Sequence, residues 1–156
     1  MAFTFYYINL IILIIMLIPS VIFQAKRDKE SKDGNEEEHK YHNRPLERIE
    51  KFGRYGTMFF YVIRLEDRKS ISTLSYAIIF ALLILYIALW IFFWNKDCLK
   101  RAITLSVIPS ILFLASAIID RNYPLLLFAL IFAPAHIAIS IKSYEFESKL
   151  KSTPAS

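Results

Sequence analysis

The sequence lacks the residues on which several common classes of protein depend. Cys98 is the only cysteine, so an internal disulfide is excluded. There is no H-E-x-x-H zinc motif, no G-x-S-x-G nucleophile motif and no phosphate-binding loop. These absences favour a protein that is not an enzyme, and the sequence assigns no catalytic residue, no cofactor and no metal.

Charged residues are also scarce, and several long segments contain none. Only 21% of the 156 residues are charged, while 56% are hydrophobic. Because a helix rises about 1.5 Å per residue, roughly 20 residues cross a hydrocarbon layer of about 30 Å. Four blocks of 18 to 21 residues contain no charge: Phe3–Phe23, Leu74–Trp94, Ala102–Ile119 and Tyr123–Ile141. These blocks predict an all-α, polytopic membrane protein.

A fifth segment, Asn43–Leu65, decides between two topologies. If it also crosses the membrane, 15 Lys and Arg lie on one side and 4 on the other. If only the four blocks cross, the split is 13 to 6. Positive residues prefer the cytoplasmic side, so the count favours five transmembrane helices, with the N-terminus outside and the C-terminus in the cytoplasm. The predicted spans are 3–23, 46–65, 74–94, 102–119 and 123–141, within a single membrane domain, 1–156.

The fifth segment is short for a crossing. From Phe52 to Leu65 there are 14 residues, which make about 21 Å of helix. Arg54 can snorkel toward the cytoplasm and Arg64 toward the outside, so that both charges leave the hydrocarbon. The alternative topology has four spans, with this segment interfacial or re-entrant.

Two charged segments complete the organisation. Residues 24–44 mix both signs of charge with few apolar residues, and we expect a flexible cytoplasmic loop there. Residues 142–156 are expected to form a cytoplasmic tail. In the loop, His39 and His42 stand beside the acidic run Glu36–Glu38, a combination that can bind a metal. Nothing in the sequence fixes their geometry, so a solvated run of charges is the preferred interpretation.

Polar residues within the spans mark the place where chemistry is possible, because burying polar groups in a membrane is costly. On the five-span topology one set lies at similar depth toward the cytoplasm: Arg54, Glu50, His136, Ser106 and Ser110. We expect Arg54 to point into the protein, close to Glu50 or His136. There its guanidinium fork can contact an anionic head group.

The same residues have a simpler interpretation as packing residues. Ser106 and Ser110 form a small-xxx-small pair of the kind found where membrane helices touch. Glu50 and Arg54 are spaced as an ordinary helix-stabilising i,i+4 pair. Sequence spacing alone leaves both interpretations open.

Three segments stand out by their motifs: "ERIEKFGRYGTMFF" (47–60), "RAITLSVIPSILFLAS" (101–116) and "FAPAHIAIS" (132–140). They resemble segments of an uncharacterised family of small integral membrane proteins from low-GC Gram-positive bacteria. The likeness covers parts of three predicted spans, about a quarter of the chain. It implies a membrane architecture only, because no activity is attached to the family.

The expected function follows from the architecture. We expect a small multi-pass protein of the cytoplasmic (inner) membrane that binds a partner protein, a peptide or a lipophilic ligand without catalysis. The expected partners are the lipid bilayer and a membrane protein or a second copy of the chain. Nucleic acid is not expected, because the net charge of +5 is explained by the cations that flank the spans. The alternative is a small transporter or lipid-handling enzyme with a polar cavity in the inner leaflet.

Overall fold

The computed structural model describes residues 4–33, 43–64, 73–96 and 98–152. These residues form five helices and one two-stranded ribbon, so the helical fold class expected from the sequence is confirmed. The elements in chain order are β1 (Thr4–Phe5), α1 (Tyr7–Asp33), α2 (Arg44–Val62), β2 (Ile63–Arg64), α3 (Thr73–Phe92), α4 (Leu99–Ile119) and α5 (Tyr123–Ser152).

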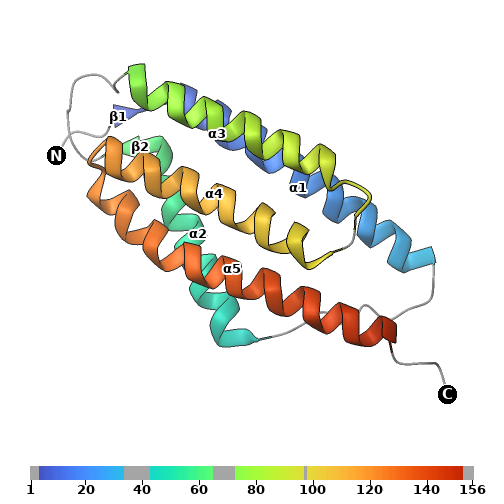
Figure 1. Ribbon diagram of the computed structural model, residues 1–156. Coiled ribbons are helices and arrows are strands. Elements are labelled where there is room, and N and C mark those ends of the chain that lie inside the picture. The colour runs from blue at the N-terminus through green and yellow to red at the C-terminus, as the bar shows by residue number, and fades with distance from the viewer. Residues whose placement is uncertain (1–3, 34–42, 65–72, 97, 153–156) are drawn as a thin grey trace.

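The helices form a bundle in which successive helices run in opposite directions (Figure 1). The most extensive contacts are those of α5, which packs against both α4 and α2. α3 packs against α4 and also contacts α1. One end of the bundle, which we call the ribbon end, holds β1, β2, the start of α3 and the α4–α5 turn (Figure 1). The opposite end, which we call the far end, holds the last turns of α1, α3 and α5 (Figure 1).

Two glycines allow α2 and α5 to lie close together. A Cβ atom on Gly53 would stand 2.8 Å from the backbone nitrogen of Phe132, a distance that forces something to move. A Cβ atom on Gly56 would meet the ring of Phe128 at 2.0 Å. Glycine inside a helix costs about 1 kcal/mol relative to alanine. The close contact between the helices explains why glycine occupies both positions.

α2 begins and ends with well-defined local structure. The Asn43 side chain accepts a hydrogen bond from the Leu46 N–H at 3.3 Å, and Glu47 accepts one in return from the Asn43 N–H at 3.2 Å. This reciprocal pairing satisfies backbone groups that the first turn leaves open. The helix ends at Val62, and β2 then pairs antiparallel with β1, with Thr4 opposite Arg64.

α1 and α5 extend further than the apolar blocks. α1 continues to Asp33, so the prediction of a flexible loop is wrong for residues 24–33. α5 continues to Ser152, through most of the segment expected to form the tail. Both extensions are rich in Lys and contain no proline or glycine, a composition that favours helix. Residues 34–42, with the histidine pair of the possible metal site, lie outside the described part of the chain.

Two of the described helices are long and apolar enough to cross a membrane. These are Leu99–Ile119 and the part of α5 from Tyr123 to Lys149. The apolar segments Tyr7–Phe23 and Tyr76–Phe92 are shorter than this criterion requires. Length and composition are shared by membrane helices and by the buried core helices of soluble proteins. The placement of polar and apolar side chains is more informative.

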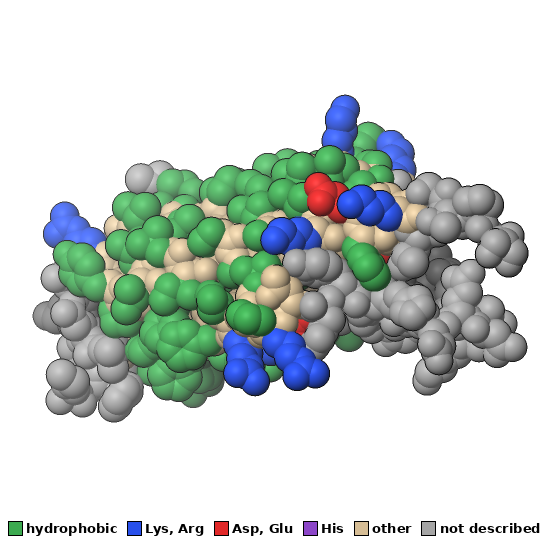
Figure 2. Space-filling model, turned by 90° about the horizontal axis from the view of Figure 1, so that it is seen from below, with side chains coloured by type: hydrophobic (Ala, Val, Ile, Leu, Met, Phe, Trp, Pro, Cys, Tyr) green, Lys and Arg blue, Asp and Glu red, His purple; other side chains and the backbone are tan. Residues whose placement is uncertain are grey.

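Polar side chains lie inside the bundle, and many large apolar side chains lie outside it. Among the described residues the buried polar or charged ones are Asn9, Glu50, Thr57, Arg64, Ser106, Ser110, Ser116 and Asn122. They share the interior with an apolar core around Tyr61 and Phe113. All the helices expose large hydrophobic residues, among them Tyr7 at 74%, Phe52 at 62% and Ile84 at 66%. The described surface seen from below is accordingly mostly hydrophobic (Figure 2).

Candidate functional site

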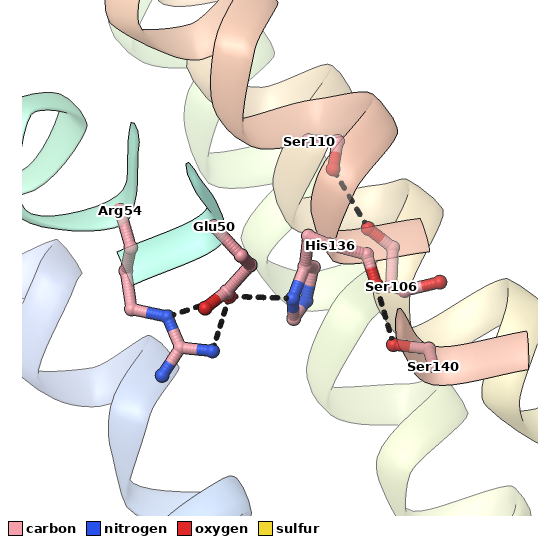
Figure 3. Close-up of polar contacts among 6 residues, drawn as sticks. All are labelled: Glu50, Arg54, Ser106, Ser110, His136 and Ser140. Carbon is pink, nitrogen blue, oxygen red and sulfur yellow. Dashed lines mark hydrogen bonds and ion pairs between the residues drawn. The ribbon is translucent and has the colours of Figure 1, made fainter. Parts of the chain in front are cut away.

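Three residues of the predicted polar cluster meet at one carboxylate oxygen. Oε1 of Glu50 accepts a hydrogen bond from Nε of Arg54 at 2.9 Å and a second from Nη2 of the same guanidinium. Nδ1 of His136 lies 3.1 Å from the same oxygen. Glu50 and Arg54 come from α2 and His136 from α5, and Figure 3 shows the Glu50 carboxylate between the Arg54 and His136 side chains. Arg54 thus contacts Glu50, but its side chain is 40% exposed and does not point into the protein as expected.

The close contact of α2 with α5 places these residues. Glu50, Gly53 and Thr57 share the buried face of α2, so the backbone contact at Gly53 lies one turn from Glu50. Phe132, the residue that Gly53 touches, lies one turn before His136 on α5. The Phe132 ring stacks on the His136 ring with centroids 4.7 Å apart. The imidazole is thus held between an aromatic ring and a carboxylate.

Exposure increases stepwise across the site. The side chain of Glu50 is 5% exposed, that of His136 23% and that of Arg54 40%. A buried carboxylate needs a cationic or hydrogen-bonding partner, and Arg54 provides one from the surface. The contact with Glu50 requires a proton on Nδ1 of His136, because a carboxylate oxygen only accepts. Nε2 of a neutral imidazole would then be an acceptor.

The two serines of the predicted cluster do not join this group. The Ser106 hydroxyl donates to the carbonyl of Ile103 at 2.9 Å, and the Ser110 hydroxyl to the carbonyl of Ser106 at 2.8 Å. Both bonds stay within α4, and no drawn interaction links either serine to Glu50 or His136 (Figure 3). With 2% and 3% exposure, these serines fit the packing interpretation.

A second polar cluster at the ribbon end was missed by the sequence analysis. Arg64 forms an ion pair with Asp120, the residue after α4, and their side chains are only 8% and 2% exposed. The Ser116 hydroxyl also donates to Asp120, at 3.3 Å. The Arg64 guanidinium lies 4.7 Å from the centre of the Tyr6 ring. Arg64 therefore points into the protein, and the expectation that it snorkels outward is wrong.

Two asparagines strengthen the same end. The Asn9 amide donates to the carbonyl of Tyr61 at 2.7 Å, and the Asn122 amide donates to the carbonyl of Phe60 at 2.9 Å. Each bond satisfies a carbonyl in the last turn of α2, where a helix leaves its carbonyls open. The end of α2 is thus tied to α1 and to the α4–α5 turn. The five-span topology puts Arg64 and Asp120 at the same end of the bundle, and this shared position is the feature of the sequence from which their pairing could have been predicted.

The remaining chemistry of the described residues is limited. Nowhere in the described ranges do three or more His, Cys, Asp or Glu side chains gather in a way that could hold a metal ion. Cys98 is a half-buried free thiol just before α4. Comparison of the chain with protein-family models, curated proteins and solved structures gives no match. The resemblance to the bacterial membrane family stays a prediction, and function must be argued from the geometry.

Proposed function

We propose that the chain is a multi-pass protein of the cytoplasmic membrane that binds a partner there without catalysing a reaction. The distribution of side chains carries this proposal: apolar residues are exposed on all the helices, while charged and polar residues are buried between them. Leaving one large apolar side chain in water is unfavourable by roughly 1.5–3 kcal/mol relative to burying it. Lipid removes this penalty, and extensive exposed apolar surface is a sign of membrane or partner contact.

Five crossings are the topology that we propose, with the N-terminus outside and the C-terminus in the cytoplasm. Successive helices alternate in direction along the bundle, as successive crossings require (Figure 1). On this topology 15 Lys and Arg of the sequence lie on the side of the far end and 4 on the other side. Because positive residues gather on the cytoplasmic side, the far end faces the cytoplasm.

The charges on α2 support its crossing rather than an interfacial position. Toward the far end, Glu50 is neutralised by Arg54 and contacts His136 of α5. At the ribbon end, Arg64 is paired with Asp120. A charge inside a membrane is tolerated when it faces the interior of the bundle and has a partner there. α2 also runs along α5 with backbone contact at Gly53, which a helix lying flat on the membrane surface would not need.

Reporter fusions test the topology. A fusion after Ser70 should report the outside, and fusions after Gly34 and Ser156 the cytoplasm, because an odd number of crossings separates them. If the Ser70 fusion reports the same side as the Gly34 fusion, α2 does not cross and the four-span alternative is correct. Resistance of the chain to alkaline carbonate extraction checks its membrane integration independently.

The binding activity is assigned to Arg54 and its surroundings. A guanidinium held by a buried carboxylate keeps its orientation, and a pre-oriented donor suits an anionic group on a lipophilic ligand or peptide. Arg54→Lys keeps the charge and loses the fork, while Arg54→Leu lengthens the apolar segment. If Arg54 anchors a site, both changes should reduce the lipid or protein that co-purifies, with membrane insertion unchanged. If Arg54 only snorkels, Arg54→Lys should be silent and Arg54→Leu should insert at least as well as the wild type.

A lipid-handling enzyme is the second candidate, and one contact favours it. A histidine whose Nδ1 faces a carboxylate at 3.1 Å is oriented so that Nε2 can accept a proton. On this alternative, purified chain should convert phospholipid in vesicles, and His136→Gln should abolish the conversion. Binding without any conversion by the wild type would leave the non-enzymatic proposal in place.

A further inference from the structure

The outward face of α2 carries cations and aromatic rings in a fixed order. With 3.6 residues per turn, six positions fall within an arc of about 100° on this face. The cations occupy the first two turns and the aromatic residues the next two. We call this face the α2 stripe; its residues are Arg44, Arg48, Lys51, Phe52, Tyr55 and Phe59.

The α2 stripe is largely exposed, although the Phe52 ring lies 5.3 Å from that of Phe128 on α5, measured between centroids. All six side chains are exposed, with Phe52 at 62%, Tyr55 at 68% and Phe59 at 49%. The opposite face of α2 holds the buried residues, including Glu50 and Gly53. Figure 2 views the bundle from below, the side on which the first turns of α2 lie in Figure 1. Lys and Arg side chains stand there among hydrophobic ones.

Along the α2 stripe, cations come first and aromatic rings follow, which is the order of headgroup and acyl chains in a phospholipid. On the proposed topology, the first turns of α2 face the cytoplasmic leaflet, and the helix then enters the hydrocarbon. Lys51 and Phe59 are eight residues apart, about 12 Å along the helix. That is close to the depth of one leaflet of a hydrocarbon layer about 30 Å thick. A phospholipid has the same order over the same distance, with a phosphate at one end and apolar chains at the other.

The positive charge on and beside the α2 stripe favours an anionic lipid over a neutral one. Arg48 and Lys51 are exposed on the stripe itself, and Arg54 flanks it with 40% of its side chain exposed. Arg54 uses Nε and Nη2 on Glu50, so the ion pair fixes the direction in which Nη1 points. Cations that border the cytoplasmic leaflet attract anionic lipids, each by about 1 kcal/mol. A soluble acidic protein would pair with the cations of the stripe but would leave Phe52, Tyr55 and Phe59 without an apolar partner.

We propose that the α2 stripe binds an anionic phospholipid of the cytoplasmic leaflet, with its phosphate at Arg48 and Lys51. The acyl chains then lie along Phe52, Tyr55 and Phe59, and Arg54 contacts the headgroup from the side. The inference rests on the proposed membrane function and names the lipophilic ligand of that function by its chemistry. It assigns the binding to side chains on the outward face of α2, beside the polar cluster that the sequence pointed to.

Competitive lipid binding tests the proposal. The full chain is purified in detergent, mixed with equal amounts of phosphatidylglycerol and phosphatidylcholine, and examined by native mass spectrometry. The wild type should retain phosphatidylglycerol in preference to phosphatidylcholine. The double variant R48Q/K51Q should lower that preference by about thirtyfold, the factor that corresponds to attraction of about 1 kcal/mol for each of the two cations removed. R48K/K51R keeps both charges and should retain the preference.

A matched variant controls for net charge. K96Q/K100Q removes two exposed cations, one just after α3 and one in the first turn of α4, and neither lies on α2. It should keep the wild-type preference. Equal losses in the two double variants would show that the lipid responds to total charge, and the α2 stripe would not be its site. Excess inorganic phosphate is added as a competitor, with chloride at the same ionic strength as its control; if phosphate alone removes bound phosphatidylglycerol, the site recognises the phosphate group only and the acyl chains do not bind along the aromatic residues.

Two further readouts separate this proposal from the membrane proposal. Carbonate extraction and the Ser70 fusion report insertion, and R48Q/K51Q should insert as the wild type does. A wild type that inserts but binds both lipids equally would overturn the lipid site and leave the membrane function standing. A wild type that does not insert would overturn both. Tyr55→Cys in a Cys98→Ser background should not cross-link to itself in bilayers, and an efficient cross-link would assign the stripe to a second copy.

Discussion

Glu50 and Asp120 are two carboxylates with different surroundings. Glu50 is buried, yet its partner Arg54 is 40% exposed and can turn to solvent when the pair is broken. Asp120 is paired with Arg64, whose side chain is only 8% exposed and has no such freedom. Removing one member of a fully buried pair leaves an uncompensated charge, which is the expensive outcome. The two ion pairs should therefore contribute unequally to stability.

The first prediction compares the two carboxylates directly. Asp120→Asn should lower the free energy of unfolding in detergent by about 3 kcal/mol, because Arg64 stays buried without its partner. Glu50→Gln should cost about 1 kcal/mol, the scale of a surface pair with added hydrogen bonds. Denaturant titrations of both variants measure the difference. A larger loss for Glu50→Gln would mean that Arg54 is not free to leave its position.

The second prediction concerns Gly53 and the contact of α2 with α5. Gly53→Ala places a methyl group 2.8 Å from backbone atoms of Phe132, which cannot move without displacing α5. We expect a loss of about 2 kcal/mol, typical of overpacking, and weaker contact between Glu50 and His136. Thermal unfolding in detergent measures the stability. The chemical shifts of the His136 ring report the contact.

Gly56 supplies the comparison for this variant. The added methyl group of Gly56→Ala meets the ring of Phe128, and a side chain can change its rotamer where a backbone cannot. Gly56→Ala should thus be milder than Gly53→Ala and should leave the His136 signals unchanged. Equal effects at both positions would argue that the whole helix contact, and not the backbone approach at Gly53, positions the site.

At the scale of elements, α2 is the helix whose placement depends most on its neighbours. It carries charges near both ends, and each has a partner that other parts of the fold hold in place. The third prediction follows from the Arg64–Asp120 pair. Arg64→Asp should reduce the fraction of molecules whose Ser70 fusion reports the outside, since two acidic residues then face each other. The exchange R64D/D120R should restore part of that fraction, because attraction returns with the signs reversed.

Arg121 provides a control for the charge exchange. It stands next to Asp120 and is exposed, with a positive φ of 50° that aspartate tolerates. Arg121→Asp makes the same charge change without touching the buried pair. It should leave the Ser70 fusion outside. If Arg121→Asp behaves as Arg64→Asp does, the outer charge count and not the ion pair controls insertion.

Particular residues show what the sequence could and could not predict. The starts and ends of α3 and α4 lie within a few residues of the uncharged blocks, because a charge in hydrocarbon is costly whatever the fold. The continuation of α1 to Asp33 was not predicted, since a run of basic and acidic residues is typical of a loop and also of a solvated helix. Local composition therefore predicts where an apolar helix such as α3 or α4 ends, but not where a helix ends within a charged segment, as α1 does.

In the candidate site, too, contacts within one helix were predictable from the sequence and contacts between distant residues were not. Glu50 and Arg54 are one helical turn apart, so their contact was predictable from spacing alone. The sequence also placed His136 at the level of these residues, and the structure brings its Nδ1 to 3.1 Å from Glu50. Arg64 was expected to turn outward from the end of its helix, whereas it is paired with Asp120 inside the bundle. Whether a terminal charge turns inward depends on a partner far away in the chain, and no single sequence reveals that partner.

The fourth prediction belongs to the whole molecule. Cys98 lies between α3 and α4, at the end of the bundle that the proposed topology places in the cytoplasm. A membrane-impermeant thiol reagent should leave Cys98 unlabelled in intact cells and label it in inverted membrane vesicles. Cys98→Ser gives the background, and a cysteine at Ser70 in that background should show the opposite pattern. Labelling of Cys98 in intact cells would reverse the orientation of the chain.

The partners of α2 are made long after α2 itself. Asp120 follows Arg64 by 56 residues, and His136 follows Glu50 by 86 residues. At about 5–20 residues per second, translation needs about 3 to 17 s to supply them. Throughout that interval Arg64 lacks Asp120, and Glu50 is paired only with Arg54 of the same helix. The final position of α2 is therefore reached late in synthesis, so the order in which the bundle is completed differs from the order in which it is translated.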